Sequence, residues 1–244
     1  MKLTGNPTIF SLNPYEQETV QEHPLGARGI GSNGDMYRYT KINAAGTDLI
    51  AGKLVVSRGR EVNHQNMTLS AVAAKGAKLL LPTAGATAVD ANEYDEGTLA
   101  FVDTSPEGET YTITAHEANA GSLVTDFYIY PGLLTVTTAA AEVSVVRNVW
   151  NNPLISQLIA EMAAGIPLSD WDVSVAGFGW LKTRGIVAGF GDTTGVTVGY
   201  RMTVSDQVDG AIGLLSDLDS EQQVGIAMEA SVNGELQPVY LTID

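Results

Sequence analysis

Few residues of this chain could perform chemistry, and none stands in a complete catalytic or metal-binding motif. The 244 residues include three histidines and no cysteine, which excludes disulfides, thiolate metal sites and a cysteine nucleophile. His116-Glu117 begins like the helix of a zinc protease, but Ala120 stands where the second histidine ligand would be. We therefore predict no metal at His116, no catalytic residue, no bound cofactor and no enzyme activity.

An acidic cluster and a glycine-rich run are the next candidates for a site. Asp217, Asp219 and Glu221 place three carboxylates within five residues. Such a group can bind a hard cation weakly, but it is more often a solvated loop, so cation binding stays open. The run 189–195 lacks the lysine and hydroxyl residue of a phosphate-binding loop and precedes a strand pattern. We interpret this run as a turn.

The net charge limits the possible partners. Lys and Arg number 13 and Asp and Glu number 28, which gives a formal charge of −15. Residues 1–80 have a balance of +3 (9 − 6) and residues 81–244 a balance of −18 (4 − 22). An acidic chain repels nucleic acid and anionic membranes, and no stretch reaches 18 apolar residues. We expect neither nucleic acid nor a membrane as partner.

Apolar and polar residues alternate with a period of two in both halves of the chain. Tyr111 and Ile113 alternate with threonines, and Val143 and Val145 flank a serine. This period is typical of half-buried strands. Asn233-Gly234, between the predicted strand segments 224–232 and 235–243, is a strong hairpin signal. The predicted fold class is all-β and mainly antiparallel, with two small β domains or barrels.

The same patterns suggest how the chain is divided. Residues 1–35 are rich in proline and glycine and predict an extended N-terminal arm. A β domain over 36–149 and a C-terminal β domain over 166–244 follow, joined by a helix or linker at 150–165. Pro153 at a first helical position and apolar residues at helical spacing predict one principal helix at about 153–164.

Exposed aromatic residues would suggest a sugar-binding surface. Trp150, Trp171 and Trp180, with Tyr200, could form one, although aromatic side chains are more often core residues or interface anchors. We therefore prefer the core interpretation.

Several segments resemble a known group of proteins. They include Arg28 to Gly31, Met36 to Tyr39, Leu49 to Leu54, Ala86 to Val89, Phe178 to Trp180, Val224 to Ala227 and Pro238 to Asp244. In this order they are similar to the cement, or decoration, proteins of tailed bacteriophages, which are virion structural proteins. The resemblance covers most of residues 25–244. It implies a protein without enzyme activity or cofactor that binds the major capsid protein. The expected location is the outer surface of the capsid, after synthesis in the host cytoplasm.

Five residues are predicted to lie at interfaces. Arg28 and Arg38 would anchor the arm on a neighbouring subunit or on the capsid, and the alternative is that the arm wraps its own domain. The helix would present Leu154, Leu158 and Met162 to another copy, which predicts a homo-oligomer, with a trimer favoured over a dimer. The alternative function is a surface or fibre-type adhesion module that binds carbohydrate or a host receptor.

Overall fold

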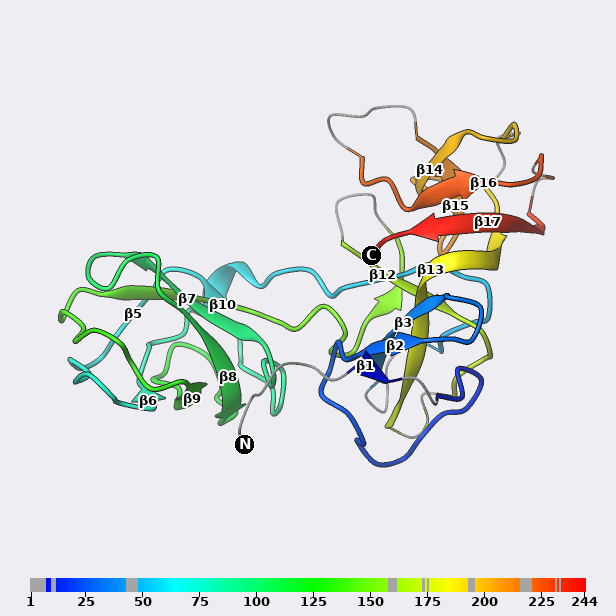
Figure 1. The fold of residues 1–244 in the computed structure, drawn as a ribbon. Helices are drawn as coiled ribbons and strands as arrows, with labels where there is room; N and C mark the ends of the chain where they lie inside the picture. The colour runs from blue at the N-terminus through cyan, green and yellow to red at the C-terminus, as the bar shows by residue number, and fades with distance from the viewer. Residues whose placement is uncertain are drawn as a thin grey trace. The chain divides into compact units, whose positions relative to one another are not determined.

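The chain forms two compact units, and each is considered by itself (Figure 1). The computed structural model describes residues 8–9, 12–42, 48–157, 162–172, 174, 176–192, 196–215, 221–230, 232 and 234–244. Unit 1 is built from both ends of the chain, Met1–Arg58 and Asn152–Asp244, and unit 2 is the continuous segment Gly59–Asn151. The two predicted β domains, 36–149 and 166–244, differ from this division because residues 36–42 pair with the C-terminal part.

Unit 2 contains a six-stranded sheet in the order β5-β10-β7-β8-β9-β6. Its elements are the 3-10 turn η1 (Val62–His64), β5 (Met67–Thr68), β6 (Leu79–Leu80), β7 (Thr98–Asp103), β8 (Thr110–His116), β9 (Phe127–Tyr130) and β10 (Glu142–Val146). Alternate residues of the long strands point into one apolar core, which includes Leu99, Tyr111, Ile113, Phe127 and Val145. Burying each such side chain contributes about 1.5–3 kcal/mol.

Unit 1 contains an 11-stranded sheet, whose main path is β1-β2-β3-β13-β17-β16-β14-β15. The strands are β1 (Thr8–Ile9), β2 (Arg28–Ile30), β3 (Met36–Ile42), β4 (Val55–Val56), β11 (Leu154–Ile155), β12 (Ala163–Pro167), β13 (Gly177–Phe190), β14 (Arg201–Val204), β15 (Ile212–Leu214), β16 (Gly225–Ala227) and β17 (Leu236–Thr242). Strands β4, β11 and β12 pair beside this path.

The 14-residue strand β13 organises unit 1. Its first half pairs with β3 and its second half with β17, both antiparallel. Val187 on β13 and Val239 and Leu241 on β17 point into one core. Tyr39 and Trp180, which are Cα partners across β3 and β13, belong to a second hydrophobic core.

The antiparallel β class is confirmed. The named strand pairs are antiparallel except β1 with β2, and the two sheets are curled. The predicted strands on either side of Asn233-Gly234 do pair, as β16 with β17, and the side chains of Val239 and Leu241 are buried; Asn233 itself lies outside the described residues.

The predicted principal helix at 153–164 is wrong. Leu154 and Ile155 form β11 and pair with Val56 and Val55 of β4, and β12 begins at Ala163 on the other side of β4. The buried strand β4 thus forms backbone pairs on both of its edges, and Ile155 and Ala163 are buried beside it; such tertiary pairing contributes more than the propensity of a short helix. Within the described ranges the only helical element is η1. No helix among them has the length and apolar character needed to cross a membrane.

The described part of the predicted arm packs on its own unit. Arg28–Ile30 forms β2 on β3, and Leu25 and Ala27 are buried against Tyr39 and Trp180. Glu18 also exchanges backbone hydrogen bonds with Phe178 of β13. Residues 12–35 therefore follow the alternative of an arm that wraps its own domain, while residues 1–7 and 10–11 lie outside the described part.

Candidate binding pocket

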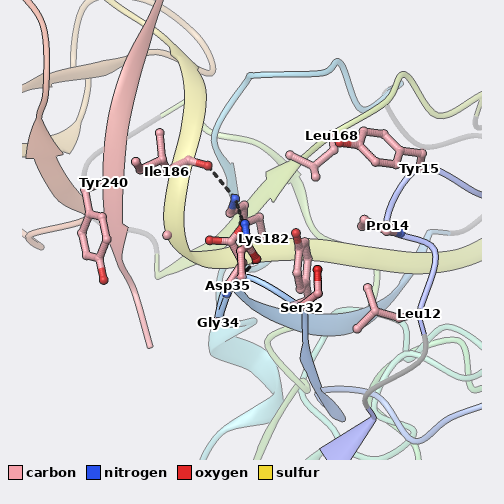
Figure 2. Close-up of a pocket in the computed structure, with 14 residues that line it drawn as sticks. Leu12, Pro14, Tyr15, Ser32, Gly34, Asp35, Leu168, Lys182, Ile186 and Tyr240 are labelled. Carbon is pink, nitrogen blue, oxygen red and sulfur yellow. Dashed lines mark hydrogen bonds and ion pairs between the residues drawn. The ribbon is translucent and has the colours of Figure 1, made fainter.

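A pocket of about 680 Å³ opens on unit 1 where β13 passes between the loop 31–35 and the segment 12–15. Figure 2 shows its two sides and its floor. The side chains of Leu12, Pro14, Tyr15 and Leu168 line one side, and Ile186 and Tyr240 line the other. Lys182, Asp35 and Ser32 lie between them at the polar floor.

The floor is built on a buried ion pair. The ammonium Nζ of Lys182 donates to Asp35 Oδ2 at 2.5 Å and to the backbone oxygen of Ile186 at 2.5 Å. The Asn33 side-chain amide donates to the same Asp35 oxygen at 2.7 Å. The two charged side chains are only 6% and 12% exposed, so each depends on the other to offset the cost of burial.

The ion pair has room because β13 is irregular at this point. The register with β3 shifts between Lys182 and Arg184, and Gly185 has a φ of +105°. A side chain at Gly185 would overlap the Asp35 carboxylate. Glycine therefore allows β13 to bulge and the carboxylate to approach the strand backbone closely.

Tyr37 of β3 adds a phenol to the polar floor. Burial, followed by the charge of Asp35, raises the pKa of Tyr37 to about 12. The phenol therefore remains neutral and can donate a hydrogen bond throughout the physiological range.

The apolar side of the pocket is held in place by backbone contacts. The hydroxyl of Ser169 donates to the backbone oxygen of Tyr15 at 3.0 Å, and the Tyr15 N–H donates to Asn13 Oδ1 at 3.2 Å. The Tyr15 side chain itself is 63% exposed. It therefore offers an accessible ring beside the polar floor.

This arrangement suits binding better than reaction chemistry. The Lys182 ammonium has two of its three donors engaged by a carboxylate and a carbonyl oxygen, and no histidine lines the pocket. Nucleophilic catalysis needs a nucleophile with an adjacent base. The pocket instead combines an apolar side with a few fixed polar groups, which is typical of ligand sites.

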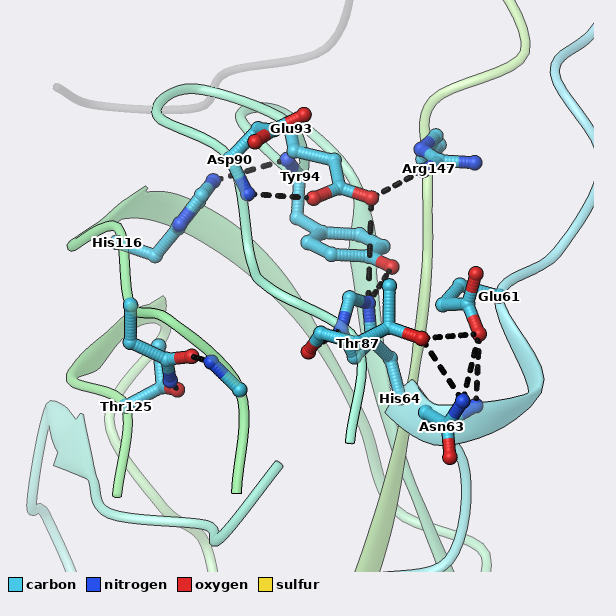
Figure 3. Close-up of polar contacts among 12 residues, drawn as sticks. Glu61, Asn63, His64, Thr87, Asp90, Glu93, Tyr94, His116, Thr125 and Arg147 are labelled. Atoms are coloured by element: carbon cyan, nitrogen blue, oxygen red, sulfur yellow. Dashed lines mark hydrogen bonds and ion pairs between the residues drawn. The ribbon is translucent and has the colours of Figure 1, made fainter. Parts of the chain in front are cut away.

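Unit 2 contains a second group of polar residues, centred on His64 (Figure 3). His64 is fully buried. Its Nε2 lies 3.1 Å from the Thr87 backbone oxygen, and its Nδ1 lies 2.6 Å from the Tyr94 hydroxyl. A carbonyl oxygen only accepts, so we assign the proton to Nε2, and Nδ1 accepts from Tyr94. Burial and the nearby Glu93 charge raise the pKa of Tyr94.

Further hydrogen bonds and an ion pair around His64 connect loops of unit 2 to its strands. Arg147 pairs with Glu93, and Asn63 and Thr87 bond to Glu61. His116 Nε2 accepts from the backbone N–H of Tyr94 at 2.9 Å. Because the two imidazoles are fully buried and bonded on both nitrogens, we interpret the group as structural.

Of the five predicted interface residues, the structure brings Arg28 and Arg38 together as Cα partners of β2 and β3. Arg38 forms a double hydrogen bond with the side chain of Asp244, both distances being 2.6 Å, and also donates to the Gly26 backbone oxygen. Arg28 is exposed and donates to the sulfur of Met36. Arg38 thus joins β3 to the end of β17 within its own unit.

The other predicted residues lie elsewhere. Leu154 is half-buried on β11, Met162 is 55% exposed next to β12, and Leu158 falls outside the described residues. Asp217 and Asp219 fall outside them too, so the acidic cluster is represented by Glu221 alone. None of the five predicted residues lines the pocket.

The three tryptophans and Tyr200 do not form one exposed aromatic surface. Trp171 and Trp180 are almost fully buried, in keeping with the core interpretation, while Tyr200 is 50% exposed. The pocket uses different rings, those of Tyr15, Tyr37 and Tyr240.

Sequence reasoning missed the residues of the pocket floor. One signal was present: Lys182 directly follows the apolar run Gly177 to Leu181, and a lysine that is buried there requires a buried partner. Nothing local identifies Asp35 as that partner, because it lies in a turn 147 residues away.

Across the described ranges, no group of three or more His, Asp or Glu side chains is arranged to hold a metal ion. Comparisons with protein-family models, with curated proteins and with solved structures gave no match for this chain.

Proposed function

We propose that the protein is a virion structural protein that decorates and stabilises a bacteriophage capsid by binding the major capsid protein. The resemblance of the sequence to decoration proteins motivates this function. The observation that supports it best is an apolar outer face on the main sheet of unit 1.

The register of the strands defines this face. Ile186, Tyr240, Ile226 and Arg201 are successive Cα partners across β13, β17, β16 and β14. In the neighbouring row, Ala188 is the partner of Pro238. Ile186 is 54% exposed, and Ala188 and Pro238 are exposed as well. The outer face of an antiparallel sheet is normally polar, so three exposed apolar residues beside the half-buried Tyr240 and Ile226 indicate a surface for a partner.

The charges on this face fit a protein partner. Arg184 and Arg201 are its exposed cations in a chain of net charge −15. Arginine with aliphatic and tyrosine side chains is typical of protein interfaces, from which lysine and acidic residues are depleted. The acidic remainder of the chain keeps a densely covered particle soluble. We further propose that copies of the chain associate, with a trimer favoured over a dimer.

The test is to mix the purified protein with undecorated capsids, pellet the particles and measure the bound protein. We expect the wild-type protein to pellet at a fixed ratio to capsid protein. The double variant Ala188→Glu/Arg201→Glu places acidic groups on the outer face and should lose most of this binding. Light scattering on the free protein measures its association.

The control is Val146→Glu, which also introduces a carboxylate, at an exposed position of β10 in unit 2, where Val146 is 52% exposed. It should pellet like the wild type. If no variant differs from the wild type, the sheet face is not the interface. If the wild-type protein itself does not pellet, the capsid function is wrong.

A further inference from the structure

The pocket on unit 1 combines an apolar side with a polar floor. Leu12, Pro14 and Leu168 supply aliphatic surface beside the exposed ring of Tyr15. The floor beside this surface carries the Lys182–Asp35 ion pair and the Ser32 side chain (Figure 2), together with the neutral phenol of Tyr37. A ligand that fits both must have one apolar face and polar groups around its edge.

The charges of the floor are balanced within the protein. The Asp35 carboxylate accepts from Lys182 and from Asn33, and the Lys182 ammonium has its counter-ion in place. A ligand carboxylate or phosphate would therefore compete with Asp35 for Lys182, and it would approach a chain of net charge −15. A cationic ligand would have to compete with Lys182 for the same carboxylate. These conditions favour a neutral ligand.

Hydrogen-bonding capacity remains on this neutral floor. The ammonium has three donors, and two of them go to Asp35 and Ile186; within the described residues no third acceptor contacts it. The exposed Ser32 hydroxyl can both donate and accept. Ligand hydroxyls, which also donate and accept hydrogen bonds, complement these donors and acceptors of the floor.

The volume is adequate for a small organic ligand. About 680 Å³ lies within the range of roughly 300–1,000 Å³ that is usual for such sites. A pyranose ring has an apolar face of C–H groups that packs on aromatic rings, and an edge of hydroxyls. We infer that this pocket binds a neutral saccharide, with one ring face on Tyr15 and its hydroxyls at the Lys182–Asp35 floor.

This binding goes beyond capsid decoration, and the two can be tested separately. The pocket shares Ile186 and Tyr240 with the proposed capsid-binding face, so saccharide binding is measured on the free protein.

The experiment uses saturation-transfer NMR on the full chain with the methyl glycosides of glucose, galactose, mannose and N-acetylglucosamine. At least one should bind. The variant Tyr15→Ala removes an exposed ring and should weaken that binding about tenfold. The matched control Tyr200→Ala removes another exposed tyrosine, which does not line the pocket, and should bind like the wild type.

Three results would overturn the inference. The first is no signal from any of the four glycosides at concentrations in the tens of millimolar. The second is equal weakening by Tyr15→Ala and Tyr200→Ala, which would place binding elsewhere. The third is binding of glucuronic acid at least as strong as that of methyl glucoside, which would show that the site selects an anion. Capsid pelleting by Tyr15→Ala, measured in parallel, reports on decoration alone.

Discussion

At the scale of single residues, Asp244 links the end of β17 to β3. Burial alone would raise the pKa of Asp244, but the hydrogen bonds and the charge of Arg38 outweigh it and hold that pKa below its usual value. Thr183 donates a further hydrogen bond at 3.0 Å. The carboxylate therefore stabilises the fold fully above the unfolded pKa of about 3.9, and this contribution is lost as the pH falls through the lower folded pKa.

We expect Asp244→Asn to lower the free energy of unfolding by about 1–2 kcal/mol at neutral pH, since the double hydrogen bond is charge-assisted but partly exposed. The difference from the wild type should shrink below about pH 4. Urea unfolding at neutral and acidic pH measures this difference. A difference that is the same at both pH values would show that the charge of Asp244 contributes nothing.

The residues of the pocket show what sequence reasoning can and cannot reach at this scale. The turn at Ser32 to Asp35 is visible in the sequence, and so is the position of Lys182 directly after an apolar run. Their pairing depends on the register of β3 with β13 and on the shift at Arg184. Register is set by packing across the whole sheet, and a local pattern does not encode it.

At the scale of elements, the bulge of β13 makes a prediction about Gly185. We expect Gly185→Ala to be more destabilising than Gly199→Ala by about 1–3 kcal/mol. Both glycines have positive φ, +105° and +86°, so both substitutions incur a similar backbone cost of about 1–2 kcal/mol. Only a side chain at Gly185 meets other atoms, the carboxylate of Asp35 and the Lys182 side chain, whereas Gly199 has open space around its Cβ position.

Thermal or urea unfolding of the two variants measures the difference directly. Equal losses of stability would mean that the bulge relaxes without disturbing the ion pair. A larger loss for Gly185→Ala, together with weaker glycoside binding, would show that the bulge supports the pocket.

The strands and the predicted helix illustrate two kinds of sequence signal. Long alternating segments such as Thr110–His116 were identified because one face is buried and the other is not. The segment at 153–164 has apolar residues at helical spacing, but β4 offers a backbone edge on each side, and Leu154 and Ala163 both pair with Val56. Such tertiary pairing overrides a local helical pattern, and no feature within the segment indicates it.

At the scale of the whole molecule, unit 2 is inserted into unit 1. The core of unit 2 and all six strands of its sheet belong to residues 59–151. The sequence suggested a boundary near residue 149, close to the observed end of unit 2 at Asn151. It gave no sign that residues 1–58 belong with the C-terminal part, because that association depends on the pairing of β3 with β13.

This organisation predicts that the two units can be separated genetically. The ends of unit 1 at the insertion point are joined, since Arg58 Nε donates to the Asn152 backbone oxygen at 2.9 Å and the Asn152 N–H donates to the Lys41 backbone oxygen at 2.7 Å. A variant in which a short Gly-Ser linker replaces residues 59–151 should therefore fold, because a short closed loop adds little entropic cost. The separate fragment 59–151 should fold as well.

Circular dichroism and urea unfolding of both proteins test this prediction, and each should show a β spectrum and a single cooperative transition. A fragment of residues 152–244 alone is the matched control. It should not fold, because it lacks β3, the partner of the first half of β13, and β4, the partner of β11 and β12. If residues 152–244 fold without the N-terminal strands, or if the linked unit 1 does not fold, then the division of the chain proposed here is wrong.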